Sequence, residues 1–155
     1  MRSIVPLLVG VLLALGVGLM ATAVGLDRDR AFYPTVAIVI ASLYSLFAVL
    51  GGSTHALVID SLLGCVFLAA ALAGFRSSLW VVVAALAAHG VLDFFHAGVV
   101  SNPGVPPWWP AFCLAYDVTA AAYLACLLIT GRSAAGFPGR GSGVGGASPT
   151  GRVAG

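Results

Sequence analysis

The sequence predicts an all-α integral membrane protein, a bundle of five transmembrane helices followed by a disordered C-terminal tail. The first reason is composition: of 155 residues, 61% are hydrophobic and 8% are charged, whereas roughly a quarter of the residues in a soluble domain are charged. The second reason is that the apolar residues form long unbroken blocks. A helix of ~20 apolar residues crosses the ~30 Å hydrocarbon layer of a bilayer.

The first three apolar blocks are separated by short polar segments. The first expected span covers residues 4–26. Its segment 21–23 (ATA) resembles a signal-peptidase site, but the apolar run continues past it, so we expect an uncleaved span. The charged segment 27–30 (DRDR) leads into a second span at 32–50, where Pro34 falls in the first turn and costs little. The third span, 56–75, follows a short connection.

Two further spans and a tail complete the chain. The fourth span covers residues 79–100, and the proline-rich segment 101–109 after it predicts a loop. The fifth span covers residues 110–130, so the transmembrane domain is expected at 1–130. Residues 131–155 are mostly Gly, Ser, Pro and Arg. Such a segment buries too little apolar surface to offset its ordering entropy, which predicts a disordered tail.

The arginines predict the orientation in the cell membrane. Positively charged residues near span ends favour the cytoplasm. With five spans, the N-terminus and the connections at 51–55 and 101–109 share one side, where the only arginine is Arg2. All other arginines fall on the opposite side: Arg28, Arg30, Arg76, Arg132, Arg140 and Arg152. We therefore expect the N-terminus outside and the tail in the cytoplasm. The net charge of +2 comes mostly from the tail and does not argue for nucleic-acid binding.

The ionisable residues within the spans are selective in type. Asp60, His89, Asp93, His96 and Asp117 lie inside apolar blocks, whereas no Arg does and the chain has no Lys. Each such residue costs ~2.5–3.5 kcal/mol even on the lenient insertion scale. In the expected orientation, all of them fall at the midplane or in the outer half of the membrane. This selectivity indicates a polar site.

The spacing predicts which of these residues meet. His89, Asp93 and His96 follow the spacing i, i+4, i+7 and share one helix face. Lipid chains cannot form hydrogen bonds to the polar side chains of that face, so the face must turn towards protein. Small residues on both sides of Asp117 allow the fifth span to approach closely. We therefore expect His89, Asp93, His96 and Asp117 to converge.

Three interpretations of this group compete. Imidazoles and carboxylates suit a divalent metal such as Zn, Fe or Mn, with all four residues as ligands and Asp60 or His55 as a catalytic base. Chains of Asp and His also carry protons in pumps and transporters, which would indicate a proton relay or proton-coupled transporter. Finally, Asp–His hydrogen bonds could serve only to fix the packing of the helices.

Charge balance favours the metal. Two carboxylates deep in the membrane must be protonated, paired with charged imidazoles or bound to a cation. A divalent cation would also turn a bound water into a nucleophile. A proton path needs polar groups that continue to the far side, and below Asp117 the fifth span offers only Thr119, Tyr123 and Thr130. We therefore predict a metal-dependent hydrolase acting on a lipid or another apolar substrate.

Three segments resemble a bacterial family of small multi-pass membrane proteins of unknown function. They are DRDRAFYP at 27–34, HGVLDFFH at 89–96 and NPGVPPWWP at 102–110. The resemblance covers residues 25–130 and brings no assigned activity, so it adds no residue roles.

One feature predicts self-association. Ala14, Gly18 and Thr22 are spaced to form a ridge of small residues on the first span. Such ridges let transmembrane helices pack closely, so we expect that a homo-oligomer can form through this face.

Overall fold

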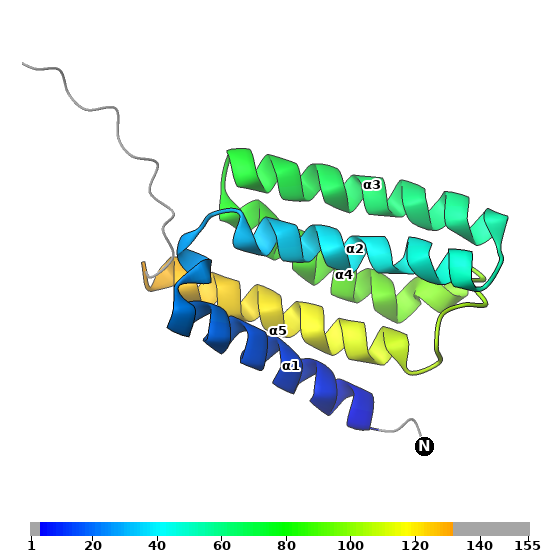
Figure 1. Ribbon diagram of the computed structural model, residues 1–155, viewed down its shortest axis with the longest axis horizontal. Coiled ribbons are helices and arrows are strands. Elements are labelled where there is room, and N and C mark those ends of the chain that lie inside the picture. Colours follow the sequence, from blue (N-terminus) through cyan, green and yellow to red (C-terminus); the bar gives the residue numbers. More distant parts are fainter. Residues whose placement is uncertain (1–3, 132–155) are drawn as a thin grey trace, which may run out of the picture.

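The computed structural model describes residues 4–131, which form five α-helices and one short 3-10 helix and contain no strand (Figure 1). Each α-helix has 19 to 23 residues and is apolar enough to cross a membrane. The predicted fold class is therefore confirmed, whereas residues 132–155 of the expected tail lie outside the described part. The elements are α1 (Val5–Val24), η1 (Leu26–Arg28), α2 (Phe32–Leu50), α3 (Thr54–Arg76), α4 (Leu79–Val99) and α5 (Trp109–Ile129).

Successive helices run antiparallel, and α4 lies inside the bundle. Helix α1 packs along α5, α5 along α4, and α3 along both α2 and α4, while α2 also contacts α4. Figure 1 shows α1 and α5 side by side at one edge and α3 at the other. Because α4 has neighbours on three sides, its polar face can turn towards protein.

The outward faces of the helices are apolar. Leu12 on α1, Val66 on α3 and Phe94 on α4 are 68%, 64% and 59% exposed. A water-soluble bundle would carry charged side chains at such positions, because a large exposed apolar surface is unfavourable in water. These side chains are therefore suited to contact lipid, as expected for a multi-pass membrane protein.

Short-range signals set the helix ends. The hydroxyl of Ser53 accepts a hydrogen bond from Ala56 N, so α3 starts at Thr54, slightly earlier than hydropathy alone predicts. Ser78 caps α4 in the same way through Trp80 N. Gly25 ends α1 with φ of 81°, a left-handed conformation that glycine adopts without strain.

Helix α1 packs closely against α5 through small residues. A Cβ added at Gly10 would lie 2.4 Å from Phe112 O, and one at Gly18 would lie 2.9 Å from the Tyr123 ring. Ala14, between them, is 3% exposed. The ridge from which we predicted a homo-oligomer is thus occupied by α5 of the same chain.

The two ends of the bundle differ in chemistry. At one end, which we call the arginine end, the guanidinium of Arg30 donates to the carbonyls of Gly74, Phe75 and Ser77 and so fastens the α1–α2 connection to the end of α3. The opposite end, which we call the loop end, carries the α2–α3 connection and the proline-rich segment after α4.

Candidate His/Asp centre

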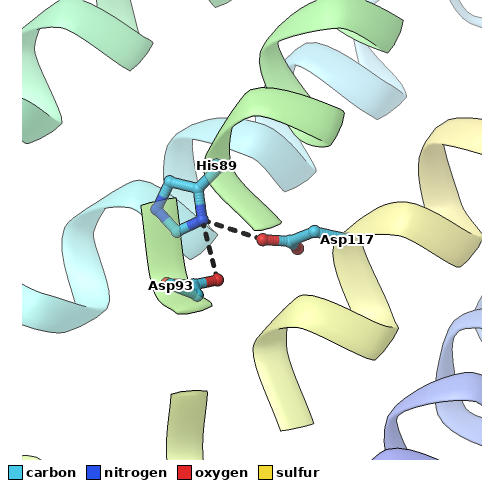
Figure 2. A group of neighbouring side chains, drawn as sticks. All are labelled: His89, Asp93 and Asp117. Carbon is cyan, nitrogen blue, oxygen red and sulfur yellow. Dashed lines mark hydrogen bonds and ion pairs between the residues drawn. The ribbon is translucent and has the colours of Figure 1, made fainter. Parts of the chain in front are cut away.

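Three ionisable side chains meet where α4 lies against α5. His89 lies near the middle of α4, Asp93 follows one turn later, and Asp117 projects from α5 (Figure 2). His89 Nδ1 and Asp117 Oδ2 form a hydrogen bond of 2.8 Å, and Nδ1 lies 3.3 Å from Asp93 Oδ2. We call these three residues the centre.

Glycine permits the close approach of the two helices. A Cβ added at Gly90 would lie 3.2 Å from Asp117 Cβ and 3.3 Å from Leu114 O. These distances are shorter than ordinary van der Waals contacts, so a larger residue would push α5 away from His89. The position of Gly90 next to His89 therefore helps to bring Asp117 within hydrogen-bond distance.

The centre is closed to its surroundings. Asp93 and Asp117 are 0% exposed, and His89 is 4% exposed. The ring of Phe67 on α3 contacts the His89 imidazole edge to face, with the ring centroids 4.7 Å apart. An isolated charge in such a place is strongly disfavoured, so the carboxylates need compensation.

The carboxylates of the centre have few hydrogen-bond partners. Within residues 4–131, neither oxygen of Asp93 has one, and Asp117 Oδ1 also lacks one. The buried hydroxyl of Tyr44 lies close to Asp93 and interacts with it, but the two form no hydrogen bond of ordinary geometry. Buried polar atoms nearly always have hydrogen-bond partners. A cluster of buried oxygens without them therefore indicates a place where a proton, a water molecule or an ion binds.

A second polar group lies nearer the loop end. His96 Nε2 donates to Asp60 Oδ1 at 2.8 Å, and Asn102 Nδ2 donates to Asp60 Oδ2 at 2.8 Å. Asn102 also donates to Tyr44 O, and the Tyr44 ring stacks on the His96 imidazole at 3.8 Å. Both oxygens of Asp60 are therefore satisfied, in contrast to those of Asp93.

A small cavity is lined by His89 of the centre and by Asp60 and His96 of the second polar group. Its volume is about 10 Å³, which is close to the minimum space that one water molecule needs. Its lining residues are Ala41, Tyr44, Asp60, Leu63, Gly64, Phe67, His89, Leu92 and His96.

The structure thus divides the residues predicted to converge. His89, Asp93 and Asp117 come together, and their ligand atoms all lie within 4.8 Å of one another. His96 joins Asp60 instead. His55 is exposed in the first turn of α3, and no hydrogen bond or ion pair within residues 4–131 links it to either group.

A third polar group, which the sequence did not predict, lies towards the arginine end. The Thr22 hydroxyl donates to Asp27 Oδ2 at 2.7 Å and accepts from Tyr123 at 2.8 Å. Among the described residues the buried Tyr33 hydroxyl has no hydrogen-bond partner, although it interacts electrostatically with Asp27 and Tyr123. Tyr123 on α5 was expected below Asp117, whereas Thr22, Asp27 and Tyr33 come from α1, η1 and α2, so only the folded chain brings the group together.

Comparison with known proteins gives no further guide to this centre. A scan against protein-family models, a search of curated proteins and a search of solved structures each returned no match. The resemblance to a bacterial membrane-protein family stays a prediction from the sequence.

Proposed function

We propose that this multi-pass membrane protein binds a divalent cation at the centre through His89, Asp93 and Asp117. The supporting observation is the set of buried carboxylate oxygens without hydrogen-bond partners, both on Asp93 and one on Asp117. A cation would satisfy them and offset the two negative charges together, whereas a charged imidazole would offset one.

The donor atoms lie within 4.8 Å of one another, so a small inward shift would place them around one cation. Nitrogen and oxygen ligands bind transition metals at ~2.1 Å, so neighbouring donors in one coordination sphere lie ~3 Å apart. His89 Nδ1 lies 2.8 Å and 3.3 Å from its two carboxylate partners. One imidazole and two carboxylates are donors that Zn, Fe and Mn accept.

A cation bound at the centre would activate a water molecule, which is the first requirement for hydrolysis. A bound divalent cation lowers the pKa of its water ligand and polarises bonds to oxygen. The cavity of about 10 Å³ beside His89 has room for about one water. Hydrolysis of a lipid or other apolar substrate, as predicted from the sequence, requires in addition that the helices part to admit the substrate.

Metal analysis tests the proposal. The purified protein is stripped with a chelator, loaded with Zn²⁺, Mn²⁺ or Fe²⁺, desalted and analysed for bound metal. We expect about one equivalent in the wild type, as for a closed site with protein ligands. The variants Asp93→Asn and Asp117→Asn should lose it while retaining their helical circular dichroism.

Two control variants make the test specific. Asp27→Asn changes a buried aspartate far from the centre, and His55→Ala removes an exposed histidine. Both should bind as much metal as the wild type. Wild-type protein that stays metal-free, or centre variants that keep full metal content, would overturn the proposal.

A proton relay is the second candidate, and the third polar group favours it. Tyr116 lies in electrostatic range of Asp117, and Tyr33 lies in range of both Tyr116 and Tyr123. Tyrosine side chains therefore interact electrostatically with both the centre and the group around Asp27. A metal-free wild type that carries protons into dye-loaded vesicles, and stops doing so in Tyr33→Phe, would support the relay instead.

A further inference from the structure

The geometry points to Asp60, His96 and Asn102 as the access site through which a cation reaches the centre. This inference rests on the proposed cation binding and adds the direction from which the ion arrives. We call the three residues the access group.

The position of the access group is the first argument. His96 lies in the last turn of α4, and Asn102 belongs to the segment that follows the helix. Asn102 is partly exposed, whereas Asp60 and His96 are each 2% exposed. The access group therefore lies between the loop end and the buried centre.

Continuity with the centre is the second argument. The small cavity touches Asp60 and His96 as well as His89. Tyr44 spans the same gap, because its ring stacks on His96 and its hydroxyl interacts with Asp93. A cation leaving Asp60 would thus meet oxygen and nitrogen donors before it reaches the centre.

The opposite direction along α4 is closed by apolar side chains. Val82 and Leu86 on α4 and Leu124 on α5 are at most 1% exposed and belong to one hydrophobic cluster. The polar atoms beside this cluster are tyrosine hydroxyls, including that of Tyr33, and a neutral hydroxyl binds a cation less strongly than a carboxylate does. This contrast favours arrival from the loop end.

The contacts of Asp60 suit a transient site. Its two oxygens are held by a neutral amide and an imidazole, and an arriving cation can displace both because it binds carboxylate oxygen more strongly. Asn102 also accepts from Gly104 N, which ties Asp60 to the loop backbone. Movement of this loop would open the access group.

The rate of metal loading tests the inference. Stripped protein is mixed with Zn²⁺ in a stopped-flow instrument, and an indicator dye reports the free metal. Asp60→Asn should slow loading about tenfold or more, because a negative charge that focuses cations at an access point raises association rates by ~10–10³. The final metal content should equal that of the wild type. Asn102→Ala should load faster than the wild type, because the loop no longer restrains Asp60.

A neighbouring serine provides the matched control. Ser61→Ala removes a hydrogen bond to Ser45 across α2 and α3, next to Asp60 but outside the cavity lining. It should load at the wild-type rate. Wild-type rates in both Asp60→Asn and Asn102→Ala would overturn the access site, as would loss of metal content in Asp60→Asn, which would make Asp60 a ligand. Wild-type protein that never binds metal would instead overturn the proposed function.

Discussion

His89 and Asp117, on different helices, form a 2.8 Å contact in the apolar interior of the bundle. Removing one partner of such a pair leaves the other without compensation, which typically costs ~3–5 kcal/mol. We therefore expect His89→Ala and Asp117→Asn each to lower the free energy of unfolding strongly. The double variant should lose less than the sum, with a coupling energy of ~0.5–3 kcal/mol.

A double-mutant cycle in detergent, with helical circular dichroism as the probe, measures this coupling. The exposed His55 supplies the control, since His55→Ala should change stability by less than ~0.5 kcal/mol. If the effects of the two substitutions on the free energy of unfolding are additive, the contact between α4 and α5 contributes no coupling energy.

The sequence predicted the helices and part of the centre for clear physical reasons. Long apolar blocks specify spans, and the i, i+4 spacing placed His89 and Asp93 on one face. The fifth span contains no other Asp, Glu or His, so Asp117 was the natural partner. The partner of His96 was not predictable in the same way, because it depends on how α3 and the loop after α4 return to α4. The helical periodicity of the sequence does not determine how α3 and this loop pack against α4.

The loop at the loop end gives the second prediction. Asn102 donates to Tyr44 O and Asp60 Oδ2, and Asn102→Ala leaves the buried Asp60 Oδ2 without a donor at a cost of ~1–3 kcal/mol. Amide hydrogen exchange of the backbone at 101–106 should accelerate. Ser101→Ala, at an exposed neighbouring position, should leave exchange unchanged. Equal protection in both variants would mean that Asn102 does not hold the loop.

Two glycines on α1 form a matched pair. Gly10→Ala would place a Cβ 2.4 Å from Phe112 O, whereas a Cβ at Gly16 meets nothing within 4 Å. We expect Gly10→Ala to loosen the packing of α1 against α5 and to destabilise the fold. Gly16→Ala should instead raise stability by ~0.5–1 kcal/mol, because alanine is the better helix former. Thermal unfolding in detergent compares the two, and equal effects would contradict the close α1–α5 contact.

The tyrosines towards the arginine end form another matched pair. Tyr123 donates to Thr22, whereas the buried Tyr33 hydroxyl has no hydrogen-bond partner within residues 4–131. Tyr123→Phe should therefore cost ~0.5–1.5 kcal/mol, and Tyr33→Phe should be neutral or stabilising. Unfolding titrations of both variants measure the difference. A larger loss for Tyr33→Phe would indicate that an ordered water bridges Tyr33 to Asp27, which would strengthen the relay as the alternative function.

The last prediction concerns the side of the membrane that the access group faces. Arg28, Arg30 and Arg76 lie at the arginine end, and such residues near span ends favour the cytoplasm. A reporter that is active only outside the cytoplasm should therefore be active when fused after residue 52. A reporter that is active only in the cytoplasm should be active when fused at residue 131. Arg28→Gln with Arg76→Gln should weaken this preference, because both side chains are exposed. Arg30 is left intact, since it binds the end of α3. Reporters with the opposite activities would place the loop end, and with it the access group, in the cytoplasm, so the cation would then arrive from inside the cell.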